Sequence, residues 1–271
     1  MDLGTLIGLV AAFGSLGASV LLEGGSLRAL ISTPAAVIVF GGTLGATLVS
    51  VPLKQVLKLP QLLRLTLFPR HVDHAHMARE VVRLAGLARR KGLLQLESEI
   101  AGLDDPFLSK GLALVIDGTD AEMIRETLET EIAAMEARHK ASAKLFLTMG
   151  GLAPTLGVTG TVMGLVNMLA RVSDPASMGP AIATAFLATL YGVASANLLF
   201  IPLGNKLQAR SEEESHLYYM LLEGLLSIQS GASPMVIEER LKSFLTPRER
   251  NWGREAATAA GATTGEAAKA A

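Results

Sequence analysis

The sequence predicts an all-α, polytopic membrane protein with four transmembrane helices and a helical cytoplasmic domain. Two observations support this. Four runs without a single charged residue are each long enough to cross about 30 Å of hydrocarbon as a helix, which takes roughly 20 residues. Only 18% of the 271 residues are charged, below the roughly 25% typical of soluble domains, and they gather in blocks outside these runs. The runs are Leu3–Leu22, Ala29–Leu53, Leu145–Ala170 and Pro175–Asn205.

The first run is interpreted as a membrane helix that is retained in the mature protein. Asp2 is the only charge before it, so the run lacks the basic segment that precedes a signal-peptide core. It is also longer than a typical signal-peptide core. We therefore expect Leu3–Leu22 to span the membrane.

Prolines mark the ends of the second and fourth runs. Ser32-Thr33-Pro34 offers a capping hydroxyl followed by a proline in the first helical turn. Gly179-Pro180 is expected to start the fourth helix in the same way. Pro52 and Pro202 lie near the far ends of these two runs, where a helix can bend or stop.

The distribution of basic residues predicts an orientation in the membrane. The short connections at residues 23–34 and 171–179 each carry one arginine and one acid. Basic residues instead flank the other ends of the runs, so the positive-inside rule places residues 54–144, the C-terminal part and both termini in the cytoplasm. The flanking residues are Lys54, Lys58, Arg64, Arg70, Arg138, Lys140, Lys144, Lys206 and Arg210.

The part outside the membrane is expected to be helical. Thr119-Asp-Ala-Glu122 is a capping-box pattern, and no breaker separates the helix that it starts from the third run. Further helices are expected from Lys206 to about Gln229 and after Ser233, which is followed by proline. The first of these helices has an apolar face made of Ile124, Leu128, Ile132 and Met135.

These expectations divide the chain into five parts. The C-terminal part has small residues and low complexity, which is typical of disorder. The parts are a first transmembrane hairpin (1–53), a cytoplasmic helical domain (54–144), a second transmembrane hairpin (145–205), cytoplasmic C-terminal helices (206–250) and a disordered tail (251–271).

The four runs contain no Asp, Glu, Lys, Arg or His. Ionisable groups at membrane depth are the usual mark of proton relays and transport sites. If this protein moves ions, a partner chain has to supply the carboxylate. The net charge of −1 gives no reason to expect nucleic acid binding, and without cysteine there is no thiol or disulfide chemistry.

Small and hydroxyl residues take the place of charges in these runs. Gly4/Gly8, Gly41/Gly45 and Gly160/Gly164 are pairs that let helices approach closely, although packing within one chain explains them equally well. The hydroxyl and amide groups of the third and fourth runs can line a wet path or bind a partner's polar group, or they can hydrogen-bond their own backbone. They are Thr155, Thr159, Thr161 and Asn167, expected to face Thr184, Thr189, Ser195 and Asn197.

Several segments, in order, resemble the A subunit of the bacterial flagellar motor stator, the MotA/PomA family. They are APTLGVTGTVMGLVNML (Ala153–Leu169), DPASMGPAIATAFLATLYGVASANLLFIPLGNKL after it, ARRKGLLQLE (Ala88–Glu97), LVIDGTDAEMIRETLETEI (Leu114–Ile132) and GASPMVIEERLKSFL (Gly231–Leu245). The resemblance extends over nearly the whole chain up to about Arg250.

This resemblance implies partners, a place and an activity. It implies a pentamer of such chains in the bacterial inner membrane around a dimer of B subunits of the MotB/PomB type, each supplying the membrane aspartate. Flow of Na⁺ or H⁺ past that aspartate would drive torque on the rotor switch-complex protein, with no cofactor and no enzyme activity. The residue roles that the resemblance implies are Pro154, Thr161, Thr189 and Pro202 in the ion path, and Arg89, Arg90 and Glu97 at the rotor.

Simple chemistry is consistent with these roles. A proline frees a backbone carbonyl one turn back, which a membrane tolerates only beside protein or water. Threonine oxygens beside a carboxylate can replace water around Na⁺ or hydrogen-bond the protonated acid. The sequence at Thr189, ATLYG followed by SANLLFIPL, resembles the sodium-using branch of the family, which favours Na⁺ slightly over H⁺. For Arg89, Arg90 and Glu97, a solvated helix face is the alternative interpretation.

Other functions find less support. The cluster of His71, His74 and His76 in HVDHAH does not put all three on one helical face, so no metal site is predicted. HExxH, GxSxG and Walker patterns are missing. An intramembrane enzyme would need a nucleophile–base pair or metal ligands, and the runs contain no His, Asp or Glu. The remaining alternatives are a TonB/Tol-type ion-driven energiser, which typically has fewer spans, and a helical membrane scaffold without transport.

Overall fold

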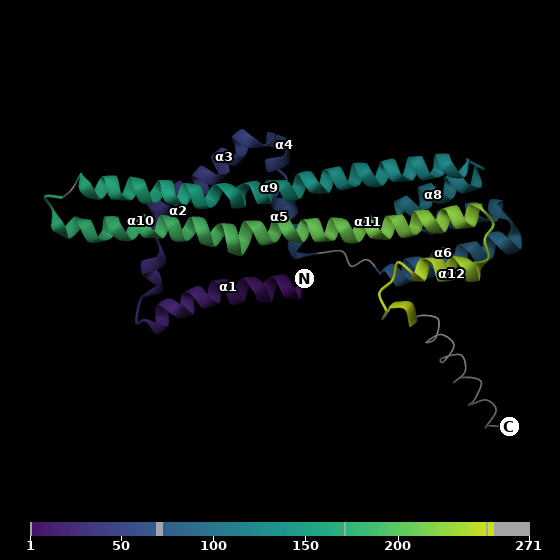
Figure 1. Cartoon of the computed structure of the whole chain (residues 1–271), viewed down its shortest axis with the longest axis horizontal. Helices are drawn as coiled ribbons and strands as arrows, with labels where there is room; N and C mark the ends of the chain where they lie inside the picture. Colours follow the sequence, from purple (N-terminus) through teal and green to yellow (C-terminus); the bar gives the residue numbers. More distant parts are fainter. Residues whose placement is uncertain (1, 69–72, 171, 248, 252–271) are drawn as a thin grey trace, which may run out of the picture. The chain divides into compact units, whose positions relative to one another are not determined.

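The computed structural model describes residues 2–68, 73–170, 172–247 and 249–251, and within these ranges the chain is helical without strands (Figure 1). This confirms the all-α prediction. The predicted disordered tail lies outside the described residues except for its first residue. The α-helices are α1 (Leu3–Leu22), α2 (Thr33–Ala36), α3 (Gly42–Ser50), α4 (Leu53–Val56), α5 (Leu59–Leu67), α6 (His74–Lys91), α7 (Glu97–Ile100), α8 (Pro106–Ile116), α9 (Ala121–Leu169), α10 (Pro175–Ser195), α11 (Ile201–Gln229) and α12 (Pro234–Lys242).

Five short helical turns connect or extend these helices. Two are π-helical and join longer helices without a break, so α2 continues into α3 and α10 continues into α11. The turns are η1 (Leu27–Leu30), η2 (Val37–Gly41, π), η3 (Leu93–Leu96), η4 (Ala196–Phe200, π) and η5 (Glu249–Asn251).

The chain forms two compact units. The first unit contains residues 1–70 and 137–211, and the second contains residues 71–136 and 212–271. Both α9 and α11 contribute residues to each unit. Residues 54–68 and 137–144 pack with the first unit, whereas the sequence placed them in the helical domain outside the membrane.

Four helical stretches of the described chain have the length and composition to cross a membrane: Leu27–Ser50, Met178–Gln229, Leu3–Leu22 and Ala121–Leu169. The prediction of four transmembrane helices is thereby confirmed. The stretch Leu27–Ser50 ends before the predicted Leu53, because the residue that precedes Pro52 cannot readily stay helical. Val51 is accordingly extended, with φ −134° and ψ 142°.

The expected caps of the second and fourth spans had different outcomes. The Ser32 side chain accepts a hydrogen bond from the backbone N–H of Ala35 at 3.5 Å and caps α2, as predicted. The expectation that Gly179-Pro180 starts the fourth helix is wrong, because α10 begins at Pro175 and contains Pro180. The earlier proline suits the first turn equally well. A helix that starts at Pro175 gains a full turn of backbone hydrogen bonds. This gain outweighs the one hydrogen bond that Pro180, which has no N–H, cannot donate.

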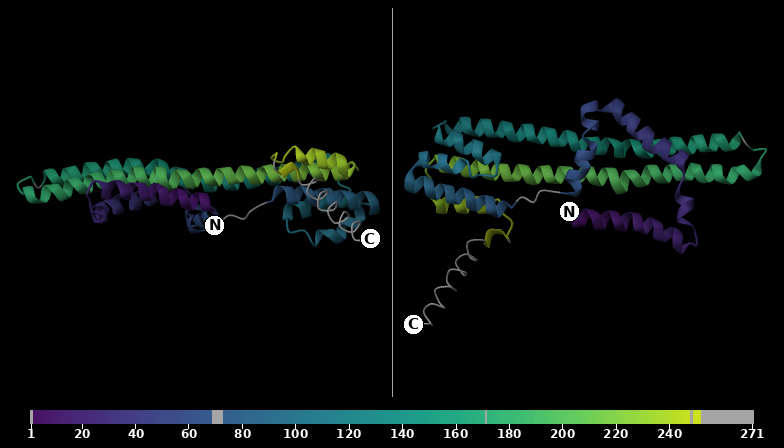
Figure 2. Two further views of the ribbon diagram at one scale, coloured as in Figure 1. Left: turned by 90° about the horizontal axis from the view of Figure 1, so that it is seen from below. Right: turned by 180° about the vertical axis from the view of Figure 1, so that it is seen from behind.

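The second unit has an apolar core between α6, α8, α11, α12 and the first part of α9. Figure 2 shows the ribbons of these helices gathered around it. The predicted face of α9 is buried in this core, and Phe107 stacks on Tyr218 with a ring-centroid distance of 4.3 Å. Burial raises the pKa of the Tyr218 hydroxyl to about 12, because the apolar surroundings disfavour its charged form. The buried residues of the α9 face are Ile124, Leu128, Ile132 and Met135.

Two helix starts in the second unit test the sequence patterns. Ser233 caps α12 through the backbone N–H of Val236 at 3.4 Å, as predicted. At the start of α9, however, the Asp120 carboxylate accepts from the N–H of Glu122 at 3.0 Å, so the capping group is one residue later than the predicted Thr119. An aspartate is as good a cap as a threonine, and the helix uses the nearer one.

Candidate functional site

The candidate site lies where α9 and α10 come closest together, within the first unit. Gly157 of α9 and Gly192 of α10 make this approach possible. A Cβ atom on Gly192 would lie 2.5 Å from the carbonyl oxygen of Ala153, and one on Gly157 would lie 2.8 Å from that of Ala188. Two backbones therefore touch, as in the close crossings that small residues allow in membranes.

The predicted Gly160/Gly164 pair belongs to the same contact. Cβ atoms on these glycines would lie 2.7 Å from the Cβ atoms of Ala188 and Ala185, respectively. The pair thus packs α9 against α10 of the same chain. The other two predicted pairs have no such contact, since Cβ atoms on Gly8, Gly41 and Gly45 would meet nothing within 4 Å.

Thr161 and Thr189 meet at this crossing. Their hydroxyl oxygens are in hydrogen-bond contact, and both side chains are half-buried. The Thr161 oxygen also lies 3.1 Å from the Gly157 carbonyl oxygen and 3.0 Å from that of Ala185. A hydroxyl has one proton and two lone pairs. The hydroxyl of Thr161 can therefore donate to one of these oxygens at a time, and the pair retains lone pairs that can accept from, or coordinate, an incoming group.

Pro154 lies on the same side of α9 as Thr161. Seven residues separate them, which is two helical turns and about 10 Å along the axis. Pro154 interrupts the hydrogen-bond ladder inside α9, because it has no N–H for the carbonyl one turn earlier. The half-buried Pro154 and Thr161 thus give this side of α9 an interrupted backbone and a hydroxyl, without a charged group.

Pro202 is in a different position. It follows the π-turn η4, in which the N–H of Ile201 donates to the carbonyl of Ala196, and such a turn accommodates the following proline. Pro202 is exposed and lines a cavity of about 370 Å³ between α1 and the η4–α11 region. The structure therefore does not bring Pro202 to the threonine pair. The remaining lining residues of the cavity are Gly4, Thr5, Gly8, Leu9, Ala12, Asn197, Leu198, Leu199, Leu203 and Lys206.

The other predicted polar residues do not form a continuous row across the two helices. Thr155 and Thr159 are exposed and bond to carbonyls of Leu152 and Thr155 in their own helix, at 2.7 and 2.9 Å. Asn197 bonds in the same way to Val193, and Ser195 to Gly192. Backbone bonding, the alternative interpretation of these side chains, therefore accounts for them within this chain. Of the expected facing pairs, Thr161 and Thr189 meet.

Tyr191 was missed by the sequence reasoning, although it supports the site. Its hydroxyl accepts from the N–H of Ser32 at 2.9 Å and donates to the carbonyl of Leu30. These bonds hold the start of α2 against α10, and Ala35 and Val39 pack there on Ala188. Tyr191 is half-buried. A tyrosine hydroxyl within a membrane helix needs a hydrogen-bond partner, and this requirement was the available signal in the sequence.

The predicted rotor-facing residues belong to the second unit. Arg89 and Arg90 are exposed in the last turn of α6, and Glu97 is exposed at the start of α7. Basic residues at a helix C-terminus and an acidic residue at an N-terminus also suit the helix dipole, so their placement has a local explanation as well. Exposed Leu94 lies between them in sequence.

A cluster of paired charges is found at the start of α1, in the first unit. The Asp2 carboxylate caps α1 and pairs with Lys206 and, at 3.2 Å, with Arg210. The hydrogen bond from Lys206 holds the pKa of Asp2 well below its usual range. Arg210 also donates to the Leu65 carbonyl at 2.7 Å, so this cluster ties α1 and α5 to α11.

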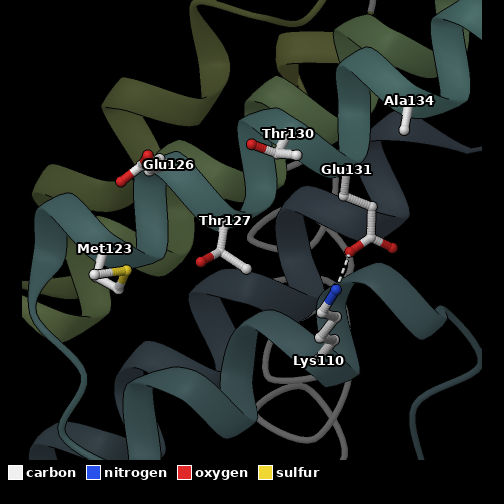
Figure 3. A pocket seen from close by; sticks show the side chains of 7 residues that line it. All are labelled: Lys110, Met123, Glu126, Thr127, Thr130, Glu131 and Ala134. Carbon is white, nitrogen blue, oxygen red and sulfur yellow. Dashed lines mark hydrogen bonds and ion pairs between the residues drawn. The ribbon is translucent and has the colours of Figure 1, made fainter.

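The described residues of the second unit form an open groove but no candidate metal site. No group of three or more His, Asp or Glu residues in the described ranges could hold a metal; of the predicted histidine cluster, His71 lies outside those ranges. An open groove of about 650 Å³ runs along α9, where Lys110 and Glu131 form an ion pair at 2.5 Å (Figure 3). Its other lining residues are Met123, Glu126, Thr127, Thr130 and Ala134.

Comparisons with known proteins agree on one family. The model of the MotA/TolQ/ExbB proton channel family matches residues 99–220. "Motility protein A" of Bacillus subtilis (strain 168) is 39% identical over 252 residues, which cover 92% of this chain and 93% of that protein. Two solved structures are similar over 91% of this chain. C. jejuni MotAB matches with a TM-score of 0.87, 30% identity and 97% of that chain covered. The flagellar MotAB stator complex of Bacillus subtilis matches with a TM-score of 0.85, 38% identity and 98% covered.

Proposed function

Because this chain belongs to the motility protein A family of flagellar stator subunits, we propose that it forms an ion channel with a B subunit and couples Na⁺ or H⁺ flow to torque on the rotor. The observation that carries the proposal is the hydroxyl pair Thr161–Thr189 on an uncharged helix crossing. Relatives that match this chain almost end to end include motility protein A of Bacillus subtilis and a flagellar stator complex. A TonB/Tol-type energiser is therefore not favoured.

The B subunit supplies the carboxylate that this chain lacks at membrane depth. Its carboxylate approaches the side of α9 that carries Pro154 and Thr161. The threonine oxygens accept a hydrogen bond from the protonated acid, or take the place of water around Na⁺. Removing the ion restores a charged carboxylate, which is costly at membrane depth unless it is hydrogen-bonded. The carboxylate of the B subunit then prefers different contacts with and without a bound ion. Ion flow alternates between these two states and so drives motion of the subunits.

Further parts of the proposal rest on the family and on the charge pattern. Five copies of this chain surround two B subunits in the inner membrane, with both termini and the second unit in the cytoplasm. The positive-inside pattern supports this orientation. Neither a cofactor nor an enzyme activity is required, since the ion gradient is the source of energy.

The experiment that tests this function measures swimming speed in a strain without its own stators. The strain receives this chain together with its B partner, and external Na⁺ is varied at fixed pH with and without a protonophore. For a sodium stator we expect speed that rises with Na⁺ and survives the protonophore. Speed that ignores Na⁺ and stops with the protonophore would identify protons as the coupling ion. No rotation, despite insertion and pairing with B, would support a non-transporting scaffold.

A second prediction concerns Arg89, Arg90 and Glu97, which we propose meet charged residues of the rotor switch protein. Charge reversal at Arg89 and Arg90 together is expected to remove most of the torque and to leave ion conduction intact, because like charges then face each other at the rotor. Torque is measured on tethered cells and conduction on the purified complex in vesicles. Reversing exposed Glu122 of the same unit serves as the control. Equal losses in both assays would show that the arginines act on folding, not on the rotor.

A further inference from the structure

The segment that follows the second membrane helix has an exposed surface that takes no part in the proposed ion path. This juxtamembrane segment, Leu53–Phe68, comprises α4 and α5. It is held to the first unit by one face only, where Val56, Leu62 and Thr66 are buried. Backbone carbonyls of α5 accept from Arg210 at 2.7 Å and from the N–H of Asp2 at 3.1 Å.

The outward face combines large apolar side chains with unpaired basic ones. The basic residues Lys54, Lys58 and Arg64 are exposed and have no ion pair among the described residues. Acidic residues are lacking over a long stretch of sequence, from residue 24 to residue 72. The exposed apolar residues are Leu53 (60%), Leu57 (70%), Leu65 (50%) and Phe68 (52%).

The position of the segment limits what it can touch. The membrane helix ends at Ser50, and three residues of extended chain reach at most about 10 Å. The polar layer of a bilayer is roughly 5–8 Å thick on each side. The segment therefore begins at Leu53 within reach of the head-group layer, where apolar side chains can enter the acyl boundary and basic ones meet head groups.

We propose that the juxtamembrane segment is a binding surface for anionic phospholipids. Lys54, Lys58 and Arg64 contact the phosphates while Leu53, Leu57 and Phe68 enter the leaflet. Charge argues for this occupant over a second copy of the same segment, since two copies would oppose their own basic residues. This surface goes beyond the proposed ion-driven function, and it rests only on membrane insertion.

The test uses the purified complex of this chain with its B partner in nanodiscs that contain equal amounts of phosphatidylglycerol and phosphatidylcholine. Spin-labelled forms of each lipid report the fraction immobilised by the protein. A basic residue near an anionic surface contributes about 1 kcal/mol, a factor of about five in association. We expect a severalfold preference for phosphatidylglycerol, and we expect the variant Lys54→Gln/Lys58→Gln/Arg64→Gln to lose most of it.

A matched control removes the same charge from the second unit. The variant Arg89→Gln/Arg90→Gln/Lys91→Gln should keep the lipid preference, because these exposed residues belong to the other unit. No preference in the unaltered complex, or an equal loss in both variants, would overturn the proposal.

A second measurement does not depend on the triple variant folding. The chain has no cysteine, so Leu57→Cys can carry a single fluorophore when the B partner is also free of cysteine. Nitroxide lipids should quench this fluorophore strongly, and should barely quench one at Leu94→Cys, an exposed leucine of the second unit (77%). Equal and weak quenching at both positions would show that protein, not lipid, covers the segment.

Discussion

Replacing both Thr161 and Thr189 with alanine is expected to abolish ion-driven rotation while the chain still inserts and pairs with its B partner. The two hydroxyls meet at the α9–α10 crossing, and each can accept a bond from a protonated carboxylate or coordinate Na⁺. Each hydroxyl can also donate to the charged carboxylate that remains when the ion leaves, and a hydrogen bond to a charged group contributes about 1.5–3 kcal/mol. If both bonds are made at the highest barrier of ion transfer, their loss would slow the transfer by at least about a hundredfold.

Rescue by serine distinguishes this chemical role from packing. The variant Thr161→Ser/Thr189→Ser keeps both oxygens and should retain rotation, whereas valine, which matches threonine in shape, should not. Thr47→Ala is the control, since Thr47 is a buried membrane threonine bonded to the Thr43 carbonyl of its own helix at 2.7 Å. Rotation speed and proton or sodium flux into vesicles are measured for each variant. Full rotation in the double-alanine variant would show that the ion path does not need these two hydroxyls.

The membrane helices could be predicted because absence of charge is a strong and local signal. The first span matches α1 residue for residue, and the apolar face of Ile124, Leu128 and Ile132 is buried as its spacing indicates. Continuity of α9 followed from the lack of any breaker before Leu145. These are properties of one helix, and one stretch of sequence determines them.

Features that depend on two segments could not be predicted in the same way. Proline permits several helix starts, and the choice between Pro175 and Pro180 depends on hydrogen bonds that neither residue reveals alone. The π-turns η2 and η4 change the register of the side chains after them, which no 3.6-residue pattern anticipates. Among the eight residues of the predicted row, the only one that such a turn affects is Asn197, which lies in η4.

Thr161 and Thr189 were predicted to line the ion path because of the family resemblance, not because of their spacing. Eight polar residues of the two spans were equal candidates by composition, and backbone bonding was an alternative for each. Gly157 and Gly192 select among them, because the helices touch there and bring Thr161 to Thr189. Glycine is common in membrane helices, so the sequence alone does not reveal its role at this crossing. That role is seen only when the partner helix is placed beside it.

The variant Gly192→Ala is therefore expected to separate α9 from α10 and to stop rotation without changing any hydroxyl. Its Cβ would lie 2.5 Å from the Ala153 carbonyl oxygen and 3.0 Å from the Gly157 Cα. These are backbone atoms, so no side-chain rotation can relieve the contact. Overpacking of this kind costs about 1–3 kcal/mol, which for a chain of this size lowers Tm by roughly 2–12 °C.

Gly179→Ala on the same helix is the matched control, because a Cβ there meets nothing within 4 Å. It should keep rotation and keep or raise Tm, since alanine favours a helix over glycine by about 1 kcal/mol. Gly157→Ala, whose Cβ would lie 2.8 Å from the Ala188 carbonyl oxygen, should act as Gly192→Ala does. The double variant should then cost less than the sum of the two, because the first substitution already moves the helices apart. Additive losses would mean that the two glycines relieve separate contacts, and normal rotation in Gly192→Ala would show that this close crossing is not needed to hold the threonine pair.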